Sequence, residues 1–186
     1  MTTRHNTTKW RRFGRARIIG VVVAIAVGIT ALTIIAASRS GGDTAGAGGG
    51  TPAPTVAFQR FDGSSATLAD YRGRPLVVNF WASWCPSCVA EMSAAFRPAQ
   101  VTLGDRVRFL GVNLQDERSR ALAMVEETGV LFELAEDQRG DLYVALGGIG
   151  MPFTVFIDAA GSVIHTHNGP VTEQQLLDLV ERFLFS

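Results

Sequence analysis

FWASWCPSC, residues 80–88, carries both cysteines of the chain, Cys85 and Cys88. It continues an apolar run that begins at Leu76, and Pro86 suits the first turn of a helix because no N–H is needed there. A strand that leads through Trp-Cys-x-x-Cys into a helix puts two sulfurs at a helix N-terminus, where unpaired N–H groups and the helix dipole favour a thiolate. A thiolate one turn from a second thiol is a reversible two-electron switch, so the stretch predicts redox chemistry.

Two other interpretations of the cysteine pair stay open. A structural disulfide across so short a loop stabilises a fold weakly. A structural zinc site needs about four ligands, and the histidines available beside the domain's cysteines are His165 and His167. We favour a redox-active Cys85–Cys88 disulfide and expect no metal. Cys85, at the helix edge with an accessible sulfur, is the expected nucleophile, and Cys88, one turn deeper, is expected to resolve the mixed disulfide.

The charge of the chain is unevenly distributed. Six of the 17 basic residues lie within residues 1–17, which contain no acid, and we expect this stretch to be a cytoplasmic arm. Residues 38–186 hold the other 11 Lys and Arg against all 17 Asp and Glu, a formal charge of −6. An acidic main body argues against a nucleic-acid partner.

The chain divides into four predicted parts, and the basic arm is the first. Residues 18–37 contain no charge and would span about 30 Å as a helix, the thickness of a bilayer's hydrocarbon core. Because basic flanks stay in the cytoplasm, we expect a single-pass membrane anchor with everything after it outside. A cleaved signal peptide, giving a secreted protein, is the alternative. Residues 38–54 read as a flexible Gly/Ala/Ser/Thr linker, and residues 55–186 as the folded domain.

Hydrophobic periodicity in the domain predicts alternating strands and helices. Strands are expected at 56–61, 76–81, 107–114, 131–134, 153–157 and 162–166. Helical segments are expected at 65–71, from 86 with an end or kink near 98, at 117–128, 140–146 and 172–185. This order predicts an α/β fold, a mixed central sheet covered by helices on both faces.

Met151-Pro152 stands directly before the predicted strand 153–157. A proline at the first position of a strand is tolerated for ordinary reasons, and alone it carries no function. Beside a Cys-x-x-Cys helix, a cis proline turn would leave the backbone of Met151 free to pair with an extended substrate. We therefore expect a cis bond at Pro152.

Residues from about 56 to 186, about 70% of the chain, resemble a thioredoxin-like domain. The combination resembles the TlpA/ResA/DsbE-like family of exported thiol-disulfide oxidoreductases. The matching segments are VVNFWASWCPSC at 77–88, Glu91, GVN at 111–113, and MPFTVFID at 151–158 with Gly161. These motifs are specific for the fold and the thiol chemistry, and they do not specify the partner.

The resemblance implies further site residues. Glu91 matches a carboxylate thought to assist proton movement near the deeper thiol, and Asp116 falls near a second family acid. Their ordinary interpretations are a solvated helix face and a helix N-cap. The residues expected to line the substrate site are Trp84, Pro86, Ser87, Met151 and Pro152. One departure is Asn79, which stands where cytosolic thioredoxins carry a buried Asp; because an amide does not titrate, that proton route is absent.

These inferences predict a membrane-anchored extracytoplasmic thiol-disulfide oxidoreductase, a reductase of the cytochrome c maturation type. The expected partners are cysteine-containing exported proteins or apocytochrome, and a membrane thiol donor or acceptor. No cofactor beyond the redox-active disulfide is expected. An oxidase for exported proteins is the main alternative, and a thioredoxin-fold copper carrier or a binding module with a structural disulfide are others.

Overall fold

A computed structural model describes residues 49–185 of the chain. The predicted arm, the predicted membrane span and residues 38–48 of the predicted linker lie outside these residues. Within residues 49–185, no helix combines the length and the apolar character needed to cross a bilayer.

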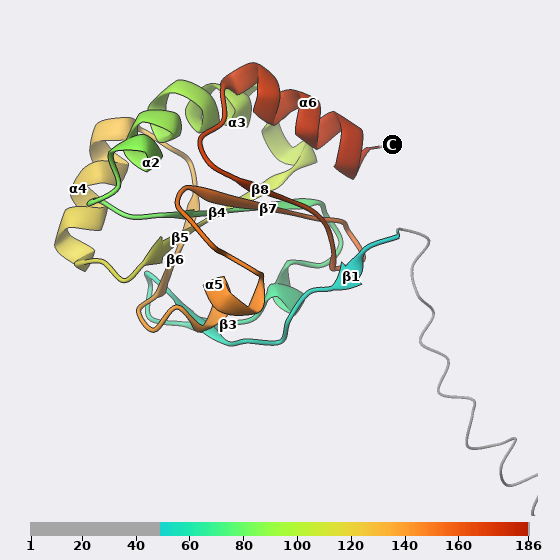
Figure 1. Ribbon diagram of the computed structural model, residues 1–186, viewed down its shortest axis with the longest axis horizontal. Helices are drawn as coiled ribbons and strands as arrows, with labels where there is room; N and C mark the ends of the chain where they lie inside the picture. Colours follow the sequence, from blue (N-terminus) through green and yellow to red (C-terminus); the bar gives the residue numbers. More distant parts are fainter. Residues whose placement is uncertain (1–48, 186) are drawn as a thin grey trace, which may run out of the picture. The chain divides into compact units, whose positions relative to one another are not determined.

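The described residues form one mixed sheet of eight strands in the order β1-β8-β7-β4-β5-β6-β2-β3. The strands are β1 Thr51–Pro52, β2 Phe58–Arg60, β3 Ser65–Ala66, β4 Leu76–Trp81, β5 Arg108–Leu114, β6 Glu133–Asp137, β7 Phe153–Ile157 and β8 Ser162–Asn168. β4, β5 and β6 run parallel, while β7 and β8 form an antiparallel hairpin beside β4 (Figure 1). The mixed α/β fold predicted from the sequence is therefore confirmed.

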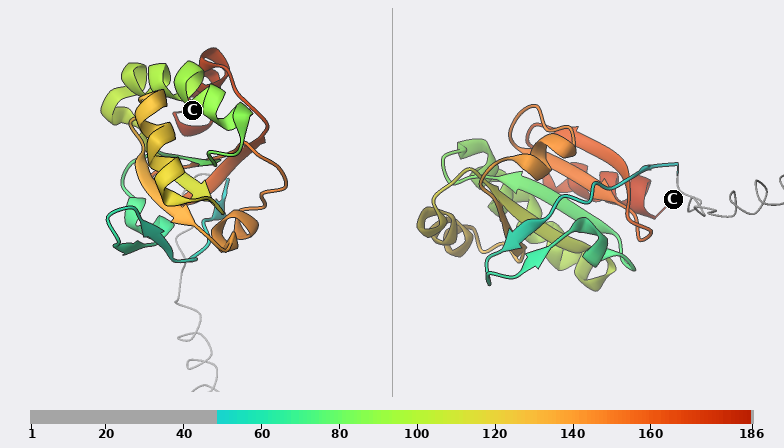
Figure 2. Two further views of the ribbon diagram at one scale, coloured as in Figure 1. Left: turned by 90° about the vertical axis from the view of Figure 1, so that its left-hand side faces the viewer. Right: turned by 90° about the horizontal axis from the view of Figure 1, so that it is seen from below.

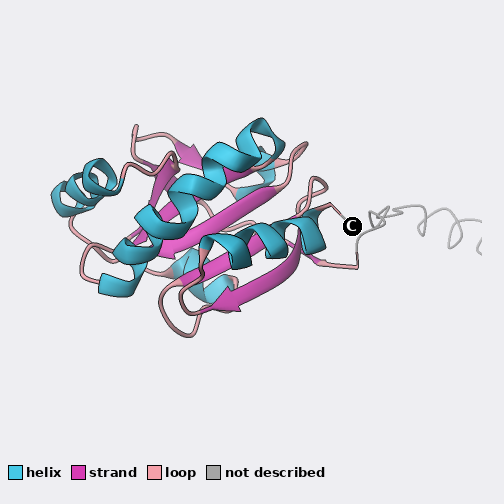
Figure 3. Ribbon diagram, turned by 90° about the horizontal axis from the view of Figure 1, so that it is seen from above, coloured by secondary structure: helices cyan, strands magenta, loops and turns pink. Residues whose placement is uncertain are grey.

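β4 is buried on both faces because helices or loops cover each side of the sheet. Val77 and Trp81 belong to one hydrophobic cluster, with the residues of α2 Pro86–Glu91, α3 Arg97–Leu103 and α6 Glu173–Leu184. Val78 and Phe80 belong to the other, with residues of the short helices η1 Leu68–Tyr71 and α5 Asp141–Ala145. Figure 3 shows the larger helices lying across one face, and Figure 2 shows the same layers from two further sides.

The helix that follows the cysteines is continuous but changes its hydrogen bonding. The π-helical segment η2 Met92–Phe96 separates α2 from α3. Pro98 lies in the first turn of α3 and lacks the N–H that would continue the α-helical ladder. The expected interruption near Pro98 is therefore present as a π-helical turn just before it.

The other helices follow the expected signals. α4 Arg118–Thr128 ends at Gly129, which has φ 65°. α6 begins at the N-cap Thr172, whose hydroxyl accepts from Gln175 N at 3.3 Å in a capping box. A single-turn helix, η3 Gly104–Arg106, leads into β5.

Several boundaries differ from the expectation. The first strand covers only 58–60, and the segment 65–71 contains a short strand before its helical turn. The strand expected at 131–134 is β6 at 133–137, because Phe132 packs its ring against Gly111 and pairing with β5 starts at Glu133. β1 pairs with β8 although the sequence assigned its residues to the linker.

Candidate active site

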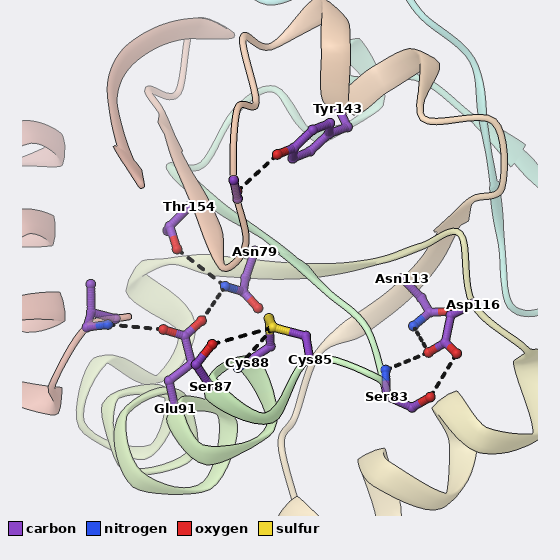
Figure 4. Close-up of a disulfide and its surroundings, with 12 residues drawn as sticks. Asn79, Ser83, Cys85, Ser87, Cys88, Glu91, Asn113, Asp116, Tyr143 and Thr154 are labelled. Atoms are coloured by element: carbon purple, nitrogen blue, oxygen red, sulfur yellow. Dashed lines mark hydrogen bonds between the residues drawn. A yellow bond between two sulfur atoms is a disulfide. The ribbon is translucent and has the colours of Figure 1, made fainter. Parts of the chain in front are cut away.

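The cysteines lie where β4 leads into α2. Cys85 is the N-cap residue of α2, with φ −107° and ψ 96°, and its sulfur accepts the backbone N–H of Cys88 at 3.3 Å. Pro86 follows in the first turn, where the absent N–H costs nothing. Cys85 and Cys88 are joined by a disulfide with a Cα–Cα distance of 5.3 Å (Figure 4).

The two sulfurs have unequal surroundings. Cys85 keeps 6% of its surface exposed and Cys88 keeps none. The order agrees with the expected roles, but the accessible sulfur expected at Cys85 is mostly covered, because this residue joins the cluster under α2. The Ser87 hydroxyl lies 3.5 Å from the sulfur of Cys85. A partner therefore meets only the small exposed part of Cys85.

The residues next to Cys85 in the chain are exposed. Trp84 is 55% exposed, and its indole Nε1 donates to the carbonyl of Gln115 at 3.2 Å, which ties the ring to the segment after β5. Pro86 and Ser87 are exposed as well. These three residues, which the sequence assigned to the substrate site, are therefore open to solvent.

The Met151–Pro152 peptide bond is cis. The loop is fixed from two sides, because Tyr143 Oη donates to the carbonyl of Gly150 at 3.0 Å and the Gly169 N–H donates to the carbonyl of Pro152 at 2.9 Å. Met151 packs against the cluster that contains both cysteines. The loop and the disulfide thus lie against the same core.

Glu91 is buried one helical turn after Cys88, with 3% of its surface exposed. Its Oε1 accepts from Asn79 Nδ2 at 3.0 Å, and its Oε2 accepts from the backbone N–H of Val171 at 3.0 Å. Burial raises the pKa of Glu91 to about 7, although the bonds from Val171 and Asn79 oppose the shift. The solvated helix face is therefore the wrong interpretation, and the residue can change its protonation near neutral pH.

A recess of about 440 Å³ lies beside Glu91, between α2 and the loop from β8 to α6. It is lined by Ser87, Ala90, Glu91, Ala94, Pro170, Val171, Thr172 and Glu173. Because Glu91 is among the lining residues, the recess is a route by which solvent protons can approach the buried carboxylate.

Asp116 ties the cysteine loop to the loop after β5. Its carboxylate accepts from Ser83 N at 2.6 Å, Ser83 Oγ at 2.7 Å and Asn113 Nδ2 at 2.9 Å. Burial acts to raise the pKa of Asp116, but the hydrogen bonds from Asn113, Ser83 and Glu117 outweigh it and lower the pKa. The N-cap of α4 is Glu117, so the N-cap interpretation of Asp116 is wrong.

Sequence reasoning missed three polar partners of the site. Ser83 and Asn113 were not singled out, although each hydrogen-bonds Asp116. Thr154 receives a hydrogen bond from Asn79 at 3.3 Å. The usable signal was polar residues inside otherwise apolar strands, since Asn79, Asn113 and Thr154 are all fully buried.

Residues 49–185 hold no group of three or more His, Cys, Asp or Glu placed to bind a metal ion. His165 stacks on Phe183, with ring centroids 4.1 Å apart. Its imidazole is thus engaged in packing on β8 and α6.

A thioredoxin-like fold with a Cys-x-x-Cys disulfide at the start of the helix after its central strand defines the chain as a thiol-disulfide oxidoreductase. The family model described as Redoxin matches residues 49–180, and the chain belongs to this family. It is similar to a thiol:disulfide interchange protein DsbE homolog of Paracoccus denitrificans, 36% identical over 138 residues and 73% of each chain. It is also similar to the thiol-disulfide oxidoreductase ResA of Halalkalibacterium halodurans, 26% identical over 93% of this chain and 96% of the relative.

The solved structure of MTB dsbF in its mixed oxidized and reduced forms is similar as well. Its TM-score is 0.64 at 25% identity, covering 71% of this chain and 98% of that one. The resemblance to the TlpA/ResA/DsbE-like family is therefore confirmed.

Proposed function

We propose that the chain is a membrane-anchored oxidoreductase that acts outside the cytoplasmic membrane on cysteines of exported proteins. The observation that carries the proposal is the disulfide between a rim cysteine, Cys85, and a fully buried one, Cys88. The apolar, uncharged stretch 18–37 after a basic arm supports the anchor. The similarity to DsbE and ResA proteins favours the reductase direction, as in cytochrome c maturation.

The exchange needs no electron carrier besides the two sulfurs. In the reductase direction, the thiolate of Cys85 attacks a disulfide of the exported protein, which forms a mixed disulfide and releases one thiol of that protein. Cys88 then attacks Cys85, so the second thiol leaves and the Cys85–Cys88 disulfide forms. Two electrons pass to the exported protein, and a membrane dithiol returns two electrons and two protons to the pair.

Glu91 is the proposed proton acceptor for Cys88. The nucleophilic form of Cys88 is a thiolate, and an apolar site opposes it. A carboxylate whose pKa is raised to about 7 takes up and releases protons near neutral pH, and the recess beside α2 connects it with solvent. Asp116, whose pKa is lowered, is suited to hold the loop of Ser83 rather than to carry a proton.

The exposed ring of Trp84, the turn Pro86-Ser87 and the loop Met151-Pro152 are the proposed contact surface for a partner polypeptide. Trp84, Pro86 and Ser87 are exposed beside Cys85 in the chain, whereas Pro152 is buried and Met151 packs against the cluster that contains Cys85. Such a surface accepts an extended peptide by shape and main-chain pairing, with little dependence on its side chains.

The direction of the reaction is tested by the equilibrium of the full-length chain with glutathione. A reductase predicts a potential below about −250 mV, whereas a value near −120 mV identifies an oxidase for exported proteins and overturns the proposed direction. Capture of partners by a Cys88→Ala variant, analysed by mass spectrometry, then identifies the exported protein and the membrane donor. An apocytochrome among them is the expected result.

A further inference from the structure

Asn79 carries a buried acceptor that the oxidised protein leaves unused. The residue is fully buried on β4, and among the described residues its Oδ1 has no hydrogen-bond partner. Leaving such an acceptor unsatisfied costs free energy, so native proteins rarely keep one without a reason.

The orientation of the amide follows from its neighbours. Nδ2 donates to the carboxylate of Glu91 at 3.0 Å and to the hydroxyl of Thr154 at 3.3 Å. With Nδ2 bonded to these two oxygens, the amide oxygen Oδ1 faces the other way. Figure 4 shows this oxygen turned toward the disulfide. Asn79 therefore joins the Glu91 carboxylate to the cysteine pair.

The two sulfurs differ in the groups that surround them. The sulfur of Cys85 receives the N–H of Cys88 at 3.3 Å and has the Ser87 hydroxyl at 3.5 Å, which are donors suited to a thiolate. Cys88 is fully buried, where a protonated thiol is favoured over a thiolate. A buried S–H needs an acceptor, and the oxygen of Asn79 is an acceptor turned toward the disulfide.

We propose that Asn79 is a positioning residue whose Oδ1 accepts the S–H of Cys88 in the reduced protein, so that reduction satisfies an acceptor that oxidation leaves unpaired. The inference rests on the proposed function, because it concerns the same redox couple. Its consequence is a pair that is easier to reduce than it would be with an apolar residue at this position. Donation from Asn79 to Glu91 also polarises the amide and strengthens its oxygen as an acceptor.

The electrons and protons balance with a dithiol donor. The donor loses two electrons and two protons and ends as a disulfide, while the Cys85–Cys88 bond breaks. One proton binds the sulfur of Cys88 and is shared with Asn79 Oδ1. The other binds Cys85 or passes to water, according to the pKa of that thiol.

The S–H stretching band in the infrared spectrum tests the contact directly. A full-length Cys85→Ala chain contains a single thiol, that of Cys88, because the sequence has only two cysteines. We expect its band at lower frequency than in the Cys85→Ala/Asn79→Leu chain. The matched control is Thr154→Val, which removes a partner of Nδ2 and leaves Oδ1, and it should keep the low band. The same frequency with Asn79 and with Leu would overturn the inference.

Two further measurements test the same contact, and the first of them needs no substitution that could unfold the chain. In the unsubstituted chain with ¹³C-labelled asparagine, the side-chain carbonyl resonance of Asn79 should move on reduction more than that of Asn113, a buried asparagine on the neighbouring strand. Asn79→Leu should also make reduction by glutathione about fivefold less favourable, which is about 20 mV for a two-electron couple. Equal movement of both resonances contradicts the inference.

The outcome is separable from that of the proposed function. If the unsubstituted chain fails to exchange with disulfide peptides, the proposed function is wrong, whatever the band shows. If it exchanges, but the S–H frequency of Cys88 is the same with Asn79 and in the Asn79→Leu chain, only the proposed role of Asn79 is wrong.

Discussion

Glu91 shows how one buried carboxylate links the redox site to pH. Glu91 is the last residue of α2; among the described residues its carboxylate has two hydrogen-bond partners, Asn79 and Val171, and burial removes nearly all of its water. Desolvation prevails over these bonds, which is why the pKa rises to about 7.

The raised pKa predicts a pH-dependent stability. The folded protein holds the Glu91 proton up to about pH 7, whereas the unfolded chain releases it near pH 4.5. Stability is therefore fully present below about 4.5 and falls as pH rises through about 7, with a total loss of about 3 kcal/mol. Urea unfolding at pH 4.5 and pH 8 should show this loss in the unsubstituted chain and a smaller one in Glu91→Gln. An equal loss in both chains would show that Glu91 is not the titrating group.

At the scale of single residues, the sequence alone predicted the position of the cysteines at a helix start. It did not predict that Glu91 is buried. The Cys-x-x-Cys spacing and Pro86 are local signals that define the helix start. The burial of Glu91 depends on Val171, which is 80 positions away. Asp116 bonds Ser83 across 33 positions for the same reason. Such pairings follow from the tertiary fold, and no short-range pattern encodes them.

At the scale of elements, Asp116 joins the loop before α2 to the loop after β5. Asp116→Ala removes the acceptor of Ser83 N and Ser83 Oγ, and we expect a destabilisation of about 2 kcal/mol in urea unfolding. Asp105→Ala is the control, because Asp105 is fully exposed and its pairing with Arg74 at 4.0 Å is weak, so its effect should stay within about 0.5 kcal/mol.

The lowered pKa of Asp116 gives this prediction a pH signature. The stabilisation is present above the ordinary pKa of an aspartate and is lost as pH falls through the depressed value. The difference between the unsubstituted chain and Asp116→Ala should therefore shrink in acid. A difference that grows in acid would contradict the bonding described here.

Gly111 lets β5 and the segment before β6 approach closely. A Cβ at this position would lie 2.5 Å from Cδ2 of Phe132, so the ring must move. Gly111→Ala should cost about 1–3 kcal/mol in thermal or urea unfolding. Gly49→Ala, where a Cβ meets open space, should change stability by less than about 0.5 kcal/mol. Equal effects at both positions would exclude the steric explanation.

The sequence predicted the order of elements because apolar runs and turn residues are local. It placed β4 at 76–81 with the bounds that the structure has. It misplaced β6 by two to three residues, because Glu133, Glu136 and Asp137 are acidic and the apolar signal ends at Leu134 and Ala135. The short strands β1 and β3 were missed, since each is only two residues long; β1 pairs with the distant β8, and β3 with the nearby β2.

At the scale of the whole molecule, the proposed membrane anchor predicts where the redox domain works. Residues 18–37 should hold the full-length chain in the membrane fraction. Alkaline carbonate should not extract the chain from the membranes, and detergent should. A chain that begins at residue 49 should be recovered in the soluble fraction. Protease added outside intact spheroplasts should digest the redox domain, because the basic arm stays inside. Release of the full-length chain by carbonate, or protection of the domain, would contradict this topology.

The central claim is that the sulfur of Cys85 forms a covalent bond with another polypeptide and that Cys88 resolves it. The direct measurement is mass spectrometry of full-length Cys88→Ala, reduced and then mixed with a disulfide-bonded peptide. The account predicts a stable peptide adduct on Cys85, and no such adduct on the buried Cys88 of the Cys85→Ala chain. If Cys85 gains no adduct, or if Cys88 is the residue that reacts, the account is contradicted.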